Sequence, residues 1–376
     1  MVDTSLTTAA TPAAFPWRDQ QVLVTGHSGF VGSWLSAALC RLGARVTGFG
    51  LDADRHTKAR AHDLAALGAK CVVGDIRDFA AVDDVMATAD FDAVFHLAAQ
   101  PLVPVGQRDP HGTLTTNILG SVNVLEAARR KRAGVVVHVT SDKCYRNRGW
   151  IWPYREADEL GGGCPYSVSK AAAELVFEAY HEAGRRTPDS RPRTASTRFG
   201  NVIGGGDHAA SRLVPDTMAA LRAGIPVELR NPDAVRPWQH VLDVVHGLLR
   251  LAERLSDGRV GSGEVFNFAP PGDGASVEAL VRALGAAWHG GQGSLPVVLR
   301  RDDRIVEDTV LRLDGRKAAA ALDWRHHFDI HTASAAIVAW QRGVDAGRSP
   351  IAATTKQIDE FLGAAGYPRL ERNGIA

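Results

Sequence analysis

The stretch QVLVTGHSGFVGSWLSAALCRLG, residues 21–43, decides the fold class. It opens with QVLVT, a run rich in β-branched residues, which predicts a strand over 21–25. A glycine-rich turn follows, and residues 33–43 then have helical periodicity and end on a glycine, as helices commonly do. A strand, a glycine turn and a helix in this order predict the first unit of an α/β sheet.

The turn reads G-x-x-G-x-x-G, and it consists of Gly26, His27, Ser28, Gly29, Phe30, Val31 and Gly32. Glycines let the backbone approach a pyrophosphate, and the N-terminus of the following helix offers unpaired N–H groups and a favourable dipole. The strand before it and the helix after it favour a dinucleotide site over an ordinary tight turn. We therefore predict that these seven residues bind a dinucleotide cofactor.

Strand and helix patterns alternate beyond this first unit. Further strands are predicted at 44–50, 71–75, 92–99, 135–141 and 194–201, and helices near 57–68, 79–88, 112–132 and 167–184. This rhythm predicts a doubly wound parallel sheet of the Rossmann type. Near-continuous apolar runs such as VVVHV indicate a sheet that is covered on both faces.

The rhythm breaks after Asn201, where the glycine-rich segment GGGDHAASR begins. A helix near 213–223 and two β-like segments, VELRN and RPWQHV, follow it, and a helix near 242–256 and a strand at 264–270 return to the sheet. We predict three parts: a flexible tail at 1–18, a nucleotide-binding domain at 19–201 plus 241–270, and a smaller α/β substrate-binding domain at 202–240 plus 271–376.

Composition narrows the function classes. The chain has 376 residues, a hydrophobic content of 45% and a formal net charge of +1, so charge does not indicate nucleic acid or a membrane surface as a partner. Apolar runs stay well short of the roughly 20 residues that a membrane span needs. Cys40, Cys71, Cys144 and Cys164 form no C-x-x-C pair, which favours a reduced, cytoplasmic protein without a metal site.

Further cofactor contacts are expected at the ends of the later strands. An acidic residue about 20 positions after the glycine turn typically binds the adenosine ribose, and Asp52 lies there. Arg55 lies beside it and could equally hold a 2′-phosphate, so NAD is preferred over NADP but not required. The remaining candidates follow the third and fourth strands and the next helix, and they are Asp75, Ile76, Leu97, Ala98, Ala99, Gln100 and Asn117. Loop capping is an equal alternative for Asp75 and Gln100.

Tyr166 and Lys170 form a Y-x-x-x-K pair, which places both side chains on one face of a helix. An ammonium beside a phenol favours the phenolate, which can take a proton from an alcohol while hydride leaves to the cofactor. The pair follows a strand that ends in Thr140 and Ser141, and that serine could hydrogen-bond the reacting oxygen. On its own the pair is typical of any solvated helix, but the order of glycine turn, serine and Y-x-x-x-K is specific.

Long strings along the chain resemble one known family. They are TGHSGFVGSWLS (25–36), HLAAQPLV (96–103), TSDKCY (140–145), PYSVSKAAAELV (165–176), GNVIGGGD (200–207), RLVPD (212–216) and LRNPDAVRPWQHVLD (229–243). With them the chain resembles the extended short-chain dehydrogenases/reductases from about residue 19 to 362, and within that family it is most similar to the CDP-glucose 4,6-dehydratases.

The resemblance implies a reaction on a nucleotide-diphosphate sugar with NAD. The cofactor would oxidise the sugar at its 4-position, water would leave from the 6-position, and the hydride would return there. Tyr166 would be the base for the 4-hydroxyl, and Lys170 would tune it and bind the cofactor ribose, so that both residues also contact the cofactor. Ser141 would contact the carbonyl. Asp142 would protonate the departing hydroxyl, and Lys143 would accept the proton from the 5-position. A solvated ion pair is the alternative for Asp142 and Lys143.

The resemblance also implies substrate contacts and an assembly. Arg212 and Arg236 would pair with the diphosphate, where a planar guanidinium fits. The further substrate-binding candidates are Gln100, Asn201, Leu213, Arg230 and Glu307, whereas Trp238 and His240 are expected to be packing residues. A homodimer is expected through the helices near 112–132 and 167–184.

Several residues depart from the family pattern close to the expected sugar pocket, namely Pro104 to Gln107, Cys164, Phe199 and His208. They leave the identity of the sugar open. Two other functions remain as alternatives. A nucleotide-sugar epimerase or simple oxidoreductase would need only Ser141, Tyr166 and Lys170, and a non-enzymatic cofactor-sensing protein would need none of them.

Overall fold

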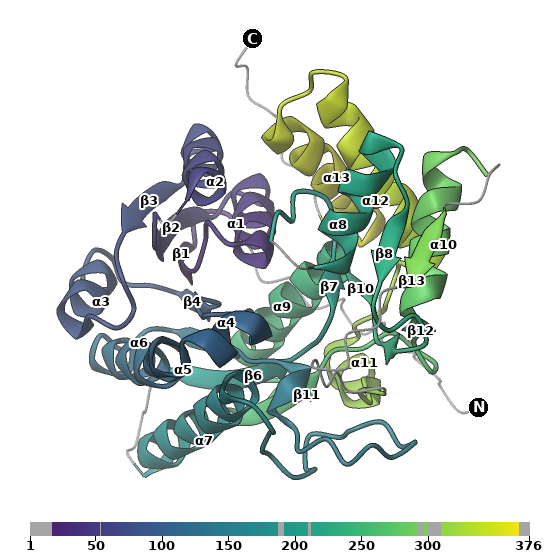
Figure 1. The fold of residues 1–376 in the computed structure, drawn as a ribbon. Helices are drawn as coiled ribbons and strands as arrows, with labels where there is room; N and C mark the ends of the chain where they lie inside the picture. Colours follow the sequence, from purple (N-terminus) through teal and green to yellow (C-terminus); the bar gives the residue numbers. More distant parts are fainter. Residues whose placement is uncertain are drawn as a thin grey trace, which may run out of the picture.

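The computed structural model describes residues 17–52, 54–186, 192–209, 212–291, 296–299 and 310–367. Its centre is a seven-stranded sheet in which every neighbouring pair of strands is parallel (Figure 1). The strands in spatial order are β11 (Glu264–Asn267), β6 (Arg193–Arg198), β5 (Val135–Val139), β4 (Ala93–His96), β1 (Gln21–Thr25), β2 (Arg45–Gly50) and β3 (Lys70–Val73). The order reverses at β1, so the predicted doubly wound Rossmann-type sheet is confirmed.

Helices cover both faces of this sheet, as parallel strands require because each must be reached by a crossover. One face packs against α1 (Phe30–Arg41) and α9 (Val241–Ser256), whose apolar side chains join those of β1 and β5 in the largest core cluster. The other face packs against α3 (Phe79–Met86), α6 (Gly120–Arg130) and α7 (Pro165–Arg185). Helix α2 (Arg55–Ala66) connects β2 to β3.

A second core lies beside the sheet and is built mostly from helices. It joins α8 (Leu213–Ala223), α10 (Val277–Trp288) and α12 (Ile330–Asp345). Three two-stranded sheets flank these helices: β7 (Val202–Ile203) with β10 (Gln239–His240), β9 (Val235–Arg236) with β12 (Ala275–Ser276), and β8 (Val227–Leu229) with β13 (Val297–Leu299). Figure 1 shows this group to one side of the large sheet.

Two C-terminal helices pack in the core of the large sheet and not in the second core. Ala318 and Leu322 of α11 (Arg316–Leu322) belong to the largest core cluster, as does Ile358 of α13 (Pro350–Ala364). Arg41 of α1 and Asp359 of α13 form an ion pair at 2.7 Å. The chain after residue 271 therefore contributes to both cores.

The predicted helix near 112–132 is present, but it begins at Pro110, ends at Arg130 and contains a π-helical turn. The structure has α4 (Val103–Arg108), α5 (Pro110–Leu114), a π-helical turn η1 (Thr115–Leu119) and then α6. Asp109 starts α5 because its carboxylate accepts a hydrogen bond from the Gly112 N–H at 2.9 Å. Asp109 followed by Pro110 is a helix-start signal that the sequence analysis missed.

The N-terminal boundary also differs from the prediction. Residues 1–16 of the predicted tail lie outside the described residues. Trp17, which the prediction placed in that tail, is buried, and its indole N–H donates to Glu253 of α9 at 2.9 Å. Trp17 is thus part of the core.

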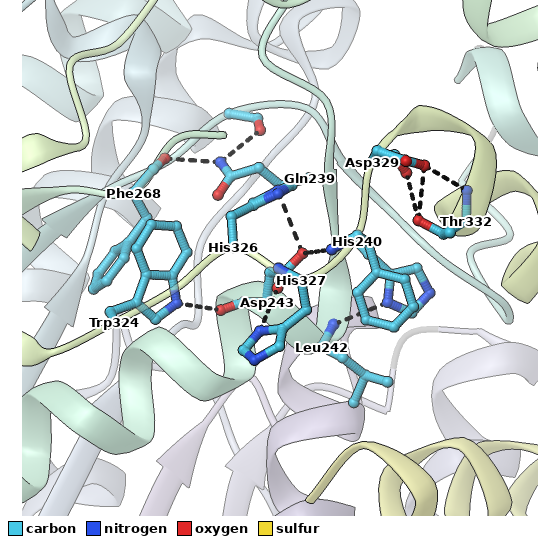
Figure 2. A network of polar contacts seen from close by, with 12 residues as sticks. Gln239, His240, Leu242, Asp243, Phe268, Trp324, His326, His327, Asp329 and Thr332 are labelled. Carbon is cyan, nitrogen blue, oxygen red and sulfur yellow. Dashed lines mark hydrogen bonds and ion pairs between the residues drawn. The ribbon is translucent and has the colours of Figure 1, made fainter. Parts of the chain in front are cut away.

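The start of α9 is tied to a distant segment by buried Asp243 (Figure 2). Its carboxylate accepts from the backbone N–H groups of His327 at 2.8 Å and Phe328 at 3.2 Å, and His326 Nε2 lies 3.3 Å from it. His240 stacks on Phe328 with ring centroids 4.2 Å apart, and burial lowers the pKa of His240 to about 4. The stacked rings of His240 and Phe328 and the buried carboxylate of Asp243 therefore join the start of α9 to the segment 326–328.

Candidate active site

The glycine turn has a shape that side chains would not allow. Gly26 has φ +74°, and a Cβ atom there would lie 2.8 Å from the Ala98 backbone. A Cβ atom at Gly32 would lie 2.1 Å from the Gly26 carbonyl oxygen. Gly29 precedes α1 and offers no side-chain cap to its first N–H groups. The turn therefore leaves a close cradle and free helix N–H groups for a phosphate.

The other residues of the turn point into the protein or hold the turn in place. His27 is buried against Gly48, where a Cβ atom would lie 2.3 Å from the ring, and burial lowers the pKa of His27. Phe30 and Val31 pack against the largest core cluster. Ser28 donates from its hydroxyl to the Leu51 carbonyl at 3.3 Å. These residues shape the cradle from beneath.

Arg60 was missed by the sequence analysis. It lies in α2 and donates to the Ser28 carbonyl at 2.9 Å and to the Gly206 carbonyl at 3.0 Å. One guanidinium thus joins the glycine turn to the loop after β7. That loop contacts α2 a second time, because His208 stacks on His56 with ring centroids 4.2 Å apart. No sequence motif marks Arg60, because its partners are two backbone carbonyls far apart in the chain.

The remaining predicted cofactor residues surround the same end of the sheet, and most are engaged with protein groups. Asp52 lies 3.7 Å from Lys58, and Asp75 accepts from Arg77 at 2.9 Å. The Asn117 side chain forms two hydrogen bonds with the Gln100 backbone: its Oδ1 accepts from the Gln100 N–H at 2.8 Å, and its Nδ2 donates to the Gln100 carbonyl at 3.1 Å.

Ile76, Leu97 and Ala98, three more of these residues, are held in place by backbone hydrogen bonds. Ile76 is buried, and its carbonyl accepts from Asn123 at 2.8 Å. The backbone N–H groups of Leu97 and Ala98 donate to Thr25, each at 3.2 Å, and Ala99 and Gln100 continue this loop. The loop is thereby held against the first residue of the glycine turn.

Ser141, Tyr166 and Lys170 come together in the interior. Strand β5 ends at Val139, and Ser141 begins the short 3-10 helix η2 (Asp142–Cys144) by accepting from the Lys143 N–H at 3.2 Å. Tyr166 lies in the first turn of α7, and its hydroxyl lies beside that of Ser141. Lys170 lies one turn further along α7, and all three side chains are buried.

Burial controls the titration of this group. It raises the pKa of Tyr166 to about 12, against which the Ser141 hydrogen bond acts. The effect of Lys170 on this phenol in the complex with cofactor and sugar stays a prediction. Burial also lowers the pKa of Lys170 to about 8, and the charge of Glu174 opposes this shift.

Asp142 and Lys143 lie directly beside this group. Asp142 is 1% exposed, and its Oδ1 accepts from the Ser141 hydroxyl at 2.9 Å and lies 3.7 Å from Lys143 Nζ. Its Oδ2 has no hydrogen-bond partner in the protein. The carboxyl group fits only because residue 200 is glycine, since a Cβ atom there would lie 1.9 Å from Oδ2. The alternative of a solvated pair is excluded for Asp142 by its burial.

The predicted substrate residues are only partly brought together. Arg212 pairs with Asp207 at 3.2 Å, and its charge acts on Tyr166. Asn201 has φ +46°, and its buried Oδ1 has no partner in the protein. Arg236 is buried and donates to its neighbour's carbonyl at 2.9 Å, whereas Arg230 acts on Asp216. Leu213 begins α8 and packs in the second core, and Glu307 lies outside the described residues.

The departures from the family pattern have structural roles. Gly106 of α4 lets that helix approach α7, since a Cβ atom there would lie 3.2 Å from Tyr166 Cβ. Cys164 caps α7 by accepting from the Ser167 N–H at 3.5 Å. Phe199 lies in the core. Gly106 and Cys164 therefore help to set the position of α7 beside the site.

The chain is similar to known proteins in sequence and in fold. The family model of the NAD dependent epimerase/dehydratase family matches residues 22–269. CDP-glucose 4,6-dehydratase of Salmonella typhimurium is 37% identical over 357 residues, which cover 93% of this chain and 98% of that protein. Among solved structures, the dTDP-glucose 4,6-dehydratase of Streptomyces venezuelae with NAD and TYD bound has a TM-score of 0.72 and 25% identity, covering 88% of this chain and 100% of that one.

A UDP-glucose 4-epimerase of Thermotoga maritima has the same fold, with a TM-score of 0.73 and 23% identity over 86% of this chain and 99% of that one. Within the described residues, the helices are all too short or too polar to cross a bilayer.

Proposed function

The chain belongs to the NAD-dependent epimerase/dehydratase family, and from that membership we propose that it converts CDP-glucose to CDP-4-keto-6-deoxyglucose. The observation that carries the choice of a dehydratase is the buried Asp142 carboxyl, with a free oxygen and with Lys143 3.7 Å away, beside Ser141 and Tyr166. Oxidation alone needs no such pair, whereas elimination of water needs an acid and a base.

The residues present fit NAD. The cradle that glycines 26, 29 and 32 leave open would hold the pyrophosphate, and Asp52 would bind the adenosine ribose. Bound NAD⁺ supplies a hydride acceptor, and later the hydride donor, next to the sugar. The protein's own part is to place Tyr166 and Lys170 at the same end of the sheet as this cradle.

Proton transfer at the 4-hydroxyl falls to Tyr166. Its hydroxyl lies beside that of Ser141, so an alcohol bound there meets the phenol as its base and the serine hydroxyl as a hydrogen-bond partner. The charged Lys170 on the same face of α7 favours the phenolate when the proton moves. Burial of the three side chains keeps water away from them.

Elimination falls to Asp142 and Lys143. Lys143 takes the proton from the 5-position, the C5–H pair forms the new double bond, and the C6–O bond breaks. Asp142 gives its proton to the departing hydroxyl, so that water leaves and one carboxylate and one ammonium remain. The two groups lie 3.7 Å apart, which favours this charged pair once it has formed.

The substrate's diphosphate is assigned to Arg212 and Arg236, with Asn201, Gln100, Leu213, Arg230 and Glu307 as further contacts. Asn201 would donate its side-chain N–H groups to the phosphates, and its buried Oδ1, which lacks a protein partner, is open to a hydroxyl group of the sugar nucleotide. Arg212 supports it as well, because its charge acts on Tyr166 and so lies close to the reacting group.

The test uses purified protein, NAD⁺ and CDP-glucose, with detection of the 4-keto product by its base-sensitive chromophore. We expect wild-type protein to produce it, and Asp142→Asn and Lys143→Ala each to lose roughly 10²-fold or more of the rate. An epimerase or simple oxidoreductase would largely survive both changes. Failure of the wild type to act on CDP-glucose or any other nucleotide hexose would refute the proposal.

The organisation around this site is proposed as well. We assign residues 19–201 plus 241–270 to cofactor binding and 202–240 plus 271–376 to substrate binding, in a cytoplasmic homodimer. Exposed Leu119, Val168 and Leu175, on η1 and α7, support a dimer contact through these helices. The four free cysteines support a reduced compartment. Light scattering of Leu175→Asp against wild type tests the dimer.

A further inference from the structure

Glu174 is buried on α7, one turn beyond Lys170 and two turns beyond Tyr166. Residues four apart share one face of a helix, so the tyrosine, the lysine and this glutamate form one row. Tyr166 and Lys170 are explained by the reaction. A carboxyl group that is 2% exposed has no place in a core unless its oxygens are paired, and the mechanism makes no use of it.

The carboxylate of Glu174 joins three elements. Its Oε1 accepts from the hydroxyls of Ser196, at 2.8 Å, and Thr140, and its Oε2 accepts from Arg198 Nη2 at 2.8 Å. Thr140 directly precedes Ser141, and Ser196 and Arg198 lie in β6. The carboxyl group is the acceptor in each of these three bonds, as an ionised carboxylate is. The helix that carries Tyr166 is thereby registered against the strand end that carries Ser141.

Arg198 is held in turn by a second layer of contacts. Its Nη1 donates to the Tyr145 hydroxyl at 2.8 Å and to the Glu156 carbonyl at 3.0 Å, and Tyr145 donates to Asn267 at 2.7 Å. The Arg198–Glu174 ion pair is therefore rigid and almost without solvent. A pair of this kind keeps its geometry because both partners have further hydrogen bonds.

The charges around Lys170 single out Glu174. The titratable groups that act on Lys170 or feel its charge come from four elements: Glu174 on α7, Cys144 on η2, His138 on β5 and His96 on β4. Burial lowers the pKa of both histidines, to about 3 for His138, and raises the pKa of Cys144, so these three are neutral near pH 7. Glu174 is the carboxylate among them, and it opposes the loss of charge on Lys170.

We propose that Glu174 is a positioning residue, which keeps Lys170 charged at working pH and locks the Tyr166–Lys170 row of α7 to the strand end that carries Ser141. This proposal rests on the proposed function, since it refines the proton transfer at Tyr166. Glu174 acts through Lys170 and contacts neither substrate nor cofactor in this scheme. Arg198 and Ser196 hold its carboxylate in place.

The test is the pH dependence of kcat/KM in Glu174→Gln. The amide keeps the shape and an acceptor oxygen but removes the charge, so Lys170 loses its proton at lower pH. We expect the basic limb of the profile to move to lower pH by roughly one unit or more. Ser196→Ala is the matched control, because it removes one hydrogen bond to Glu174 and no charge, and its basic limb should stay in place.

Two further measurements make the result independent of folding and of turnover. The double variant Glu174→Gln with Arg198→Met avoids an unpaired buried guanidinium. It should move the limb in the same direction but by less, because the positive charge of Arg198 is removed together with the negative charge that acts on Lys170. The NMR titration of isotope-labelled Lys170, assigned with Lys170→Met, should move to lower pH in both variants and not in Ser196→Ala.

An unchanged lysine titration in Glu174→Gln, or an equal shift in Ser196→Ala, overturns the proposal. A wild type without dehydratase activity but with the shifted lysine titration in the variants would refute the proposed function alone and leave this one standing.

Discussion

The glycine turn at 26–32 and the polar group around Asp142 both lie at the carboxyl ends of parallel strands, and they differ in what they leave open. The turn leaves a space that backbone atoms define, since a Cβ atom at Gly26 or Gly32 would collide with backbone. The second group leaves unpaired polar atoms, namely Asp142 Oδ2 and Asn201 Oδ1. The glycine turn is thus defined by its shape, and the group around Asp142 by buried polar atoms that lack hydrogen-bond partners.

This difference separates two ways in which a protein can hold a ligand. A space bounded by backbone accepts any group of the right form and charge, which suits a cofactor shared by a whole family. Buried polar atoms without partners require donors at particular places, because each unpaired group is unfavourable until a ligand pairs it. Selection of the sugar is therefore expected at Asp142 and Asn201, and the following changes test that division.

The largest effect is expected for Tyr166→Phe. The variant removes the proton acceptor, the hydroxyl beside Ser141, but keeps the ring and the Cβ atom that α4 approaches at Gly106. We expect turnover to fall by roughly 10²- to 10⁴-fold. NAD binding, followed by calorimetry, should stay within a few-fold of wild type, since the cradle is untouched. A large loss of NAD affinity would show that the two regions are not separable.

Gly32→Ala is the matching change in the turn. The new methyl group would lie 2.1 Å from the Gly26 carbonyl oxygen, so the backbone must shift. A strain of about 1–3 kcal/mol is typical for such overpacking, and NAD affinity should fall roughly tenfold to a hundredfold. Gly184→Ala is the control, because a Cβ atom there meets nothing within 4 Å. Equal NAD affinity in the two variants would contradict the cradle.

The pH profile sharpens the comparison on the side of the reacting group. Burial lowers the pKa of Lys170 to about 8, so the lysine is charged below that pH and loses its charge as pH rises through it. The rate of sugar oxidation should therefore fall above about pH 8, while NAD affinity at the turn stays level. Stopped-flow absorbance of the reduced cofactor measures the rate. A rate that still rises well above pH 8 would exclude this role of Lys170.

The smallest effect is expected for Arg60→Met. The change removes two hydrogen bonds that tie Ser28 and Gly206 together but leaves the glycines in place. NAD affinity should fall by only about threefold to tenfold, because the turn loses support and not its shape. His62→Gln, at an exposed position of the same helix, is the control and should have no more than a slight effect. A loss as large as that of Gly32→Ala would mean that side chains, and not backbone, define the cradle.

The sheet could be predicted from the sequence because each of its signals is local. Alternating strand and helix patterns determined the doubly wound class, and the glycine turn and the Y-x-x-x-K pair marked both sides of the site. The start of α5 could have been predicted from Asp109 and Pro110, whereas the π-helical turn at Thr115–Leu119 could not, because it continues the helical period without a breaker.

By itself the sequence determined the fold class, the cofactor turn and the order of the reacting residues, since these depend on neighbours in the chain. Only the tertiary structure decided which buried groups they meet. Arg198 opposite Glu174, Gly200 under Asp142 and Arg60 between two loops are pairings across different elements. A local pattern shows that a side chain is buried, but its partner, and with it the pKa of Lys170, depends on how distant elements pack.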